Sequence, residues 1–140
     1  MNLLKLTNEI ALKGGVSYNL NTGEMNPSAG FMVSFEEFEK VVTYVDEPIL
    51  KQYIAKHSVE LSKPNSFLGV WYDGRNYVLD VSENIPTKRD AMFWAIVRKQ
   101  KCIWDCAKQD EVWLPKKRAK LLATNKDEFF ELEKKYRNGC

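Results

Sequence analysis

The fold is decided by one stretch of the sequence, FLGVWYDGRNYVLDVS, residues 67–82. Two runs rich in aromatic and β-branched residues flank the dipeptide Asp73-Gly74, which favours the turn of a β-hairpin. In the second run, apolar residues alternate with Asp80 and Ser82, so these two polar side chains share one face of the strand. The stretch therefore predicts an antiparallel hairpin.

Upstream of this hairpin, the alternation of apolar and polar residues over 16–20 predicts a half-buried strand. The preceding residues, 3–12, fit a short helix closed by Gly14-Gly15, or a strand. A turn segment rich in Asn, Gly, Pro and Ser follows. After it, FMVSF, residues 31–35, predicts a second strand that pairs with the first as a hairpin.

Two helices are expected next. The spacing Ser34-x-x-Glu37 is that of a capping box, and it predicts a helix with five apolar residues on one side. Asp46 as N-cap and Pro48 in the first turn predict another helix directly after it. The apolar stripe of this second helix includes His57.

Downstream of the hairpin, a box that starts at Thr87 predicts a helix over residues 89–100. Residues 101–114 predict a strand, a polar turn at 108–110 and another strand. A final amphipathic helix is expected near Asn125.

This order of elements predicts the α+β class, with a mostly antiparallel sheet built from hairpins, three to five helices and a C-terminal amphipathic helix. We expect a single domain. Residues 1–115 would form its α+β core, and residues 116–140 a basic helical segment packed on it or extending from it. A hydrophobic content of 44% and an aromatic content of 12% support a real core.

The longest apolar run, residues 91–97, is far shorter than the roughly 20 residues that span a bilayer. The first residues lack the apolar core of a signal peptide. We therefore expect a cytoplasmic protein without a membrane partner.

Several kinds of chemistry have no support in the residues. The chain has three cysteines and one histidine, without a CxxC motif. On a strand, Cys102 and Cys106 would lie about 13 Å apart, and a disulfide needs Cα atoms within about 7 Å. No glycine-rich phosphate loop and no carboxylate pair with acid–base spacing occur. We expect no catalytic residue, no metal and no cofactor.

Charge is unevenly distributed along the chain. Residues 116–140 carry eight Lys+Arg and four Asp+Glu, a net charge of +4, which leaves −2 of the total of +2 for residues 1–115. The basic cluster could contact phosphates or an acidic partner, or it could be a solvated helix face. Its members are Lys116, Lys117, Arg118 and Lys120.

Four residues of the body are further candidates for binding a partner. Asp80 and Ser82 could hold a polar group, or that face of the strand could simply be solvated, or Ser82 and Asn84 could help cap the next helix. If the strand that carries Asp105 lies beside them, the three form a small polar patch. Trp113, on the last short strand, is expected to be partly exposed, as interface anchors often are.

His57 is the one obvious general base near neutral pH. Its place on an apolar helix stripe favours a core histidine. The other interpretation is a small hydrolase or transferase that uses His57, Asp80 and Ser82, and it requires the three to meet in a cleft.

Three segments, GGVSYNLNTGE…GFMVS, LGVWYDGRNYVLDVSENI and KCIWD, share a further property. Together and in this order, they resemble a family of small proteins encoded by phages, plasmids and related mobile elements. That family has a GG-strand-TG hairpin, GYMVS-like residues, a YLDVS-type strand and an IWD-type strand. The resemblance covers residues 14–106 and implies a mobile-element origin, without an activity.

Small phage proteins often work by binding a host or phage protein, which is an argument from analogy. The leading hypothesis is therefore a non-enzymatic module that binds a protein partner, such as an anti-defence or host-takeover inhibitor. The alternative is a nucleic-acid-binding accessory protein that uses residues 116–140 and whose affinity falls steeply with salt.

Overall fold

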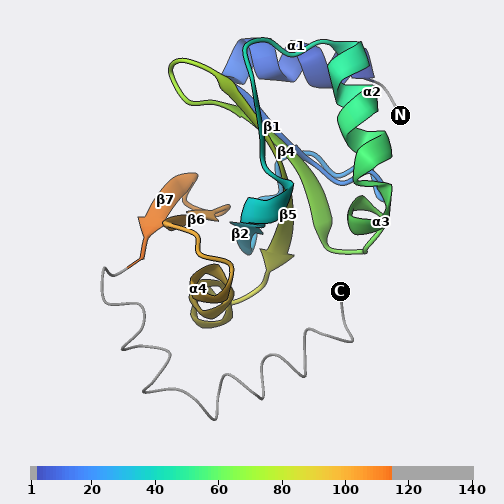
Figure 1. Ribbon diagram of the computed structural model, residues 1–140. Coiled ribbons are helices and arrows are strands. Elements are labelled where there is room, and N and C mark those ends of the chain that lie inside the picture. The colour runs from blue at the N-terminus through green and yellow to red at the C-terminus, as the bar shows by residue number, and fades with distance from the viewer. Residues whose placement is uncertain (1–2, 115–140) are drawn as a thin grey trace.

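The computed structural model (Figure 1) describes residues 3–114, which build one antiparallel sheet of seven strands with four α-helices and a short 3-10 helix. The expected α+β class is confirmed. The strands are β1 (Gly15–Tyr18), β2 (Phe31–Ser34), β3 (Lys40–Val42), β4 (Ser66–Tyr72), β5 (Tyr77–Ile85), β6 (Cys102–Asp105) and β7 (Asp110–Trp113). The helices are α1 (Leu3–Lys13), η1 (Glu36–Phe38), α2 (Glu47–Lys56), α3 (Ser58–Leu61) and α4 (Lys88–Val97).

The predicted hairpin over residues 67–82 is confirmed and forms the centre of the sheet. Strands β4 and β5 pair along their length, from Ser66 opposite Glu83 to Tyr72 opposite Tyr77. The Asp73 carboxylate closes the turn by accepting hydrogen bonds from the backbone N–H groups of Arg75 and Asn76, at 2.8 and 2.7 Å. The strand order is β1-β4-β5-β2-β6-β7, and β3 also pairs with β5.

The expected hairpin between the first two strands is wrong. Strand β1 pairs with β4, whereas β2 pairs with β5 and β6. The connection between them is tied to the end of α3, where Asn19 donates to the Pro64 carbonyl at 3.0 Å and Asn21 to the Leu61 carbonyl at 3.2 Å. These contacts hold the connection in place where it leads from the β4 side of the central hairpin to the β5 side.

The helix expected from the capping box at Ser34 and Glu37 is also wrong. Only η1 forms there, and the chain returns to the sheet as β3. The backbone finds its partners on β5, where the Phe35 N–H donates to the Val81 carbonyl at 3.1 Å and Lys40 pairs with Leu79. Ser34 does not cap a helix, because its hydroxyl contacts side chains of β5.

Two other predicted helix starts are confirmed, and the one expected near Asn125 lies outside the described residues. The Asp46 carboxylate accepts the Ile49 N–H at 3.0 Å, and the Thr87 hydroxyl accepts the Asp90 N–H at 3.3 Å. Helix α1 ends at Gly14, whose φ of 77° is the left-handed conformation of a helix C-terminus. Of the two structures predicted for residues 3–12, the helix is therefore the one that forms.

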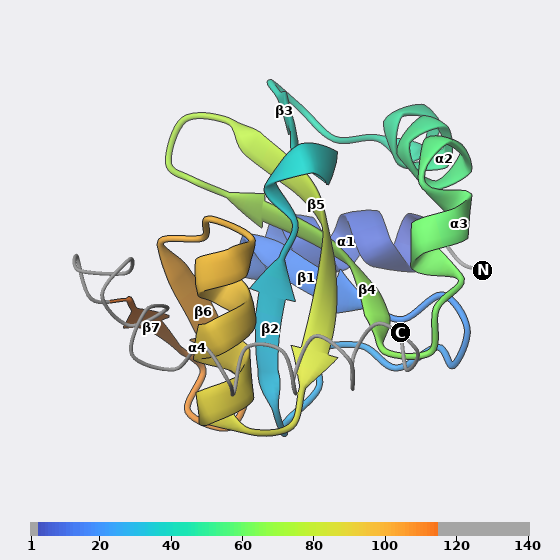
Figure 2. The same cartoon turned by 60° about the horizontal axis from the view of Figure 1, so that its bottom comes forward.

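The helices pack on one face of the sheet in two groups. Figures 1 and 2 show α1, α2 and α3 beside the β1, β4 and β5 part, and α4 beside β2 and β6. On β5, Leu79 and Val81 belong to the first cluster of buried residues and Ile85 to the second. These three residues alternate with Asp80 and Ser82, which therefore lie on the opposite face.

Candidate functional site

Three exposed or half-exposed tryptophans mark this opposite face. Trp71, Trp104 and Trp113 lie on β4, β6 and β7, with exposed fractions of 44%, 38% and 65%. Large apolar side chains in such positions are typical of binding surfaces when they gather on one side of a protein. Their relative placement therefore decides what this face can do.

The pairing register assigns the three tryptophans to one face, because cross-strand partners and residues two apart on a strand point to the same side. Trp71 is opposite Val78, which is two residues before Asp80 on β5. Ser82 is opposite Ser34, two residues after Met32.

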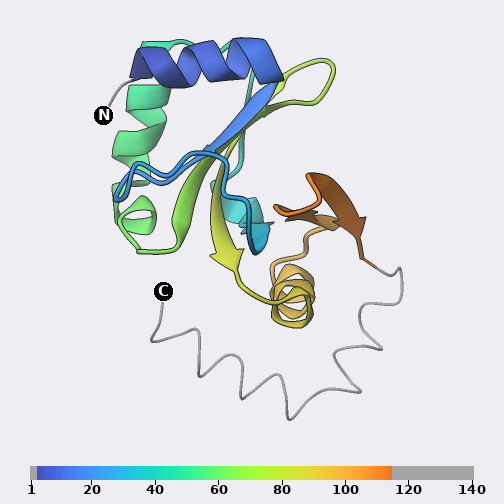
Figure 3. The same ribbon diagram turned by 180° about the vertical axis from the view of Figure 1, so that it is seen from behind.

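The chain of partners continues to the edge of the sheet. Met32 is opposite Trp104, which is two residues after Cys102. Cys102 is opposite Trp113. We call this side, with Trp71, Trp104 and Trp113, the tryptophan face. Figures 1 and 3 show the tip of the β4–β5 hairpin and the β6–β7 hairpin projecting to the same side of the molecule, away from α2 and α3.

A buried carboxylate lies within the tryptophan face. Asp80 is only 6% exposed, and its two oxygens accept hydrogen bonds from three side chains. Ser82 donates to Oδ1 at 2.8 Å, and Ser34 and the Trp71 indole N–H reach Oδ2 at 3.1 and 3.3 Å. The two serine hydroxyls also lie 3.1 Å apart. Asp80 thus ties three strands together and fixes the orientation of Trp71.

The carboxylate lies directly over Gly69, its cross-strand partner. A Cβ atom at position 69 would stand 2.1 Å from Asp80 Oδ1, which is not possible without a shift. Farther along β5, the Asn84 carboxamide lies over Gly30 in the same way. Two polar side chains of β5, those of Asp80 and Asn84, therefore lie close against glycines.

The surroundings of Asp80 shift the pKa of its carboxyl group. Burial raises the pKa of Asp80 above its ordinary value, although its three hydrogen bonds oppose the shift. Partial burial also raises the pKa of Glu39, with the nearby charge of Asp80 adding to it. Because both Asp80 oxygens are already bonded to the protein, this geometry suits a positioning group rather than one that contacts a substrate.

The structure brings Asp80 and Ser82 together and places Asp105 elsewhere. Asp105 is opposite Phe31 on β2, which is two residues from the core residue Val33, so the register assigns it to the helix-covered face. Its carboxylate closes the β6–β7 turn by accepting the N–H groups of Ala107 and Lys108, both at 3.1 Å. The three-residue patch does not form.

The interpretation that this face of β5 is solvated at Asp80 and Ser82 is also wrong, because both residues are buried. Ser82 does not cap α4, which Thr87 caps. Trp113 is exposed, as expected. Lys116, Lys117, Arg118 and Lys120 lie outside the described residues.

His57 is buried between helices α2 and α3. Its ring packs on Phe38 and Tyr53, with centroids 5.3 and 4.5 Å away. Burial lowers the pKa of His57, and the nearby Glu60 carboxylate opposes this shift. Tyr53 belongs to the core under the helices, so the sheet separates His57 from Asp80 and Ser82. The three residues do not share a cleft.

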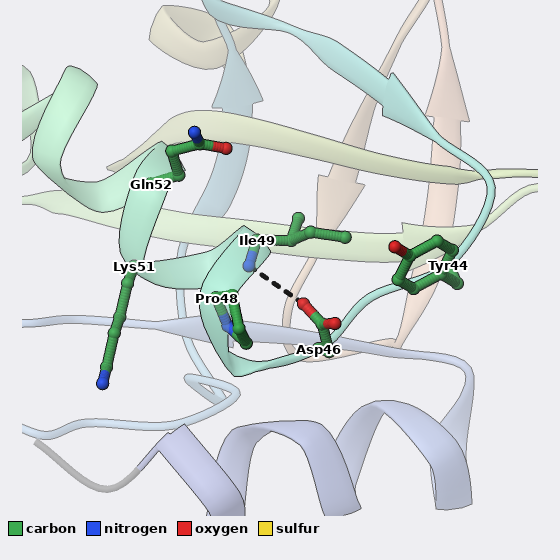
Figure 4. Close-up of a pocket in the computed structure, with 6 residues that line it drawn as sticks. All are labelled: Tyr44, Asp46, Pro48, Ile49, Lys51 and Gln52. Atoms are coloured by element: carbon green, nitrogen blue, oxygen red, sulfur yellow. Dashed lines mark hydrogen bonds between the residues drawn. The ribbon is translucent and has the colours of Figure 1, made fainter.

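A hollow of about 500 Å³ lies at the start of α2 (Figure 4). The Asp46 carboxylate in its wall is already used as the helix cap, and Figure 4 shows Lys51 pointing away from the other side chains. The hollow therefore offers little to a polar ligand. It is lined by Tyr44, Asp46, Pro48, Ile49, Lys51 and Gln52.

Between residues 3 and 114, no three His, Cys, Asp or Glu side chains gather as metal ligands would. None of the helices in that range has the length and apolar character that a membrane crossing requires. The chain matched no family model, no curated protein and no solved structure.

Reasoning from the sequence missed part of this site. The opposition of Gly69 and Asp80, and the position of Trp71 beside them, follow from the hairpin register and could have been found from it. Ser34 could not, because its place beside Ser82 depends on a pairing between segments 48 residues apart.

Proposed function

We propose that this protein is a binding module whose tryptophan face contacts a protein partner. The observation that carries the proposal is the presence of three exposed or half-exposed tryptophans on one face of a sheet whose helices pack on the other. Tryptophan is the residue most enriched among the side chains that dominate binding energy at protein interfaces. Scattered single apolar residues would not support the same conclusion.

Within this proposal, the residues of the face have different roles. Trp104 and Trp113 are the contacts, since both are exposed and lie at diagonal positions on adjacent strands. Asp80 and Ser82 are too buried to meet a partner and instead hold Trp71 in place.

The kind of partner is part of the proposal. The resemblance to mobile-element proteins supports a host protein, and with it the role of an anti-defence or host-takeover inhibitor. A small protein of this type acts by occupying a surface of its target, which needs anchors and no reaction centre.

Photo-crosslinking tests the proposal. Benzoylphenylalanine would replace Trp113 in one sample and Leu12, which is 81% exposed on α1, in the other. We expect a discrete protein adduct from host lysate with the first and none with the second. Equal crosslinking at both positions would contradict the proposal, as would an adduct that nuclease treatment removes, since that result favours the nucleic-acid alternative.

A further inference from the structure

Strand β7 ends the strand order of the described sheet, and its register shows which backbone groups face outward. The Leu114 N–H donates to the Lys101 carbonyl at 2.9 Å, so these two residues form a hydrogen-bonded pair. Such pairs alternate along an antiparallel ladder, which makes Val112 the next residue bonded to β6. The N–H and carbonyl groups of Glu111 and Trp113 therefore point away from β6.

One of these outward groups already has a local partner. The Glu111 N–H donates to the carboxylate of the preceding Asp110 at 2.8 Å. This exposed carboxylate can turn away at little cost, because water solvates it in the alternative position. The edge then offers two donors and two acceptors, the pattern that an added strand requires.

The side chains beside this edge indicate the chemistry of what would bind there. Trp104 and Trp113 provide an apolar surface next to Glu111. Among the strand residues of the tryptophan face, Glu111 is the charged side chain that is exposed, and it is acidic. An occupant with alternating cationic and apolar side chains fits this combination.

We infer that β7 is a docking edge for an extended, positively charged segment of the partner protein, which adds to the sheet beside Glu111 and Trp113. The inference rests on the proposed function and names the form of the partner. A second copy of the chain fits less well, because two four-residue edges would exchange few backbone bonds and bury less than the roughly 1,000 Å² expected of a stable interface. It would also bring the same acidic residues to both sides.

A synthetic peptide tests the inference on the full chain. The probe is fluorescein-labelled Lys-Val-Lys-Phe-Lys-Val-Lys, blocked at both ends, and binding is followed by fluorescence anisotropy. The control peptides have Glu in place of every Lys, or N-methylated backbone groups along one edge. We expect binding of the first peptide and at least tenfold weaker binding of both controls.

Two variants separate backbone pairing from charge. Glu111→Pro removes an outward N–H without touching the ladder to β6, whereas Glu111→Gln removes only the charge. We expect the proline variant to bind the probe at least tenfold more weakly than the glutamine variant. If the proline variant fails to fold, hydrogen exchange on the unmodified chain replaces it: the probe should slow exchange of the Trp113 amide at least tenfold.

Several outcomes would overturn the inference. These are equal binding by the two Glu111 variants, an unchanged Trp113 exchange rate on binding, or equal binding of the Glu peptide. Sedimentation that shows a dimer dissociated by Glu111→Pro would assign the edge to a second copy. Tighter probe binding after Lys116, Lys117, Arg118 and Lys120 are replaced by Gln would assign it to the chain's own basic segment.

The two proposals can fail separately. If crosslinking at Trp113 captures a partner while the peptide and exchange experiments fail, the docking edge is wrong and the binding module stands. If crosslinking captures nothing, the proposed function itself is contradicted.

Discussion

Asp80 occupies the space that a side chain at Gly69 would need, with its Oδ1 atom 2.1 Å from where a Cβ would stand. The glycine therefore has a structural purpose in the middle of a strand, where its flexibility otherwise weakens a sheet. The same carboxylate also accepts a hydrogen bond from the indole N–H of Trp71, so the contact between Gly69 and Asp80 affects the position of an exposed side chain.

Gly69→Ala should destabilise the fold by about 1–3 kcal/mol, because the added methyl group displaces a buried carboxylate. Urea unfolding followed by circular dichroism measures the change. The matched control is the same substitution in an Asp80→Ala background, where the methyl group has room. An equal cost in both backgrounds would show that the contact with Asp80 is not the cause.

The contribution of Asp80 to the stability of the fold should fall as pH rises above about 4, because the pKa of its carboxyl group is raised. A carboxyl group whose folded pKa lies above its unfolded pKa binds more protons in the folded state between these two values. Raising the pH across this window therefore removes stability. Asp80→Asn should flatten this decline in urea unfolding measured from pH 4 to 7.

Asp73 provides the control for this pH series. The backbone N–H groups of Asn76 and Arg75 lower its pKa, so its contribution to stability is present above the ordinary pKa and is lost only as pH falls. Asp73→Asn should leave the slope between pH 4 and 7 unchanged. If Asp80→Asn gave the same profile as the unmodified chain, Asp80 would not be the titrating group.

Arg98→Ala should cost about 3–5 kcal/mol of stability, since it removes the ion pair between Arg98 and the buried Glu83 carboxylate. Arg98 also donates to the Val33 carbonyl at 3.3 Å and stacks 3.8 Å from the centre of the Phe35 ring. A lysine cannot reproduce these planar contacts, so Arg98→Lys should recover little.

Chemical unfolding of Lys88→Ala gives the baseline for that measurement. Lys88 is exposed on the same helix, and its replacement should change stability by no more than about 0.5 kcal/mol. A similar small effect of Arg98→Ala would mean that the buried pair contributes nothing net to the fold.

Trp113→Ala should leave the unfolding free energy within about 0.5 kcal/mol of the original, because the side chain is mostly exposed. In a sample that carries benzoylphenylalanine at position 104, the Trp113→Ala substitution should also abolish the crosslink to the partner. Phe67→Ala, on the same face but buried, should instead cost about 3–5 kcal/mol. A large stability loss for Trp113→Ala would indicate a packing role and remove it as a contact.

Local signals in the sequence predicted local structure correctly. The hairpin at Asp73-Gly74 and the caps at Asp46 and Thr87 depend on neighbouring residues only, and each forms as expected. The capping box at Ser34 failed because β5 offered its backbone and hydroxyl better partners than a helix did. Tertiary context overrides a local preference of this size.

The candidate site was predictable to a similar extent. That Asp80 and Ser82 share a face follows from strand alternation alone. Their burial does not, because it depends on how Trp71 and the residues of β2 lie around them. The placement of Asp105 on the other face required the register between β2 and β6, which no local pattern specifies.

The position of β2 has a consequence for how the chain acquires its structure. Residues 31–34 pair with residues 82–85 on one side and with β6 on the other, so β2 has no partner strand until that later part of the chain has been synthesised. Contacts between such distant segments close large loops and slow folding. During synthesis, the β4–β5 hairpin comes first, and a nascent chain that stops before residue 82 exposes an unpaired strand to chaperones and proteases.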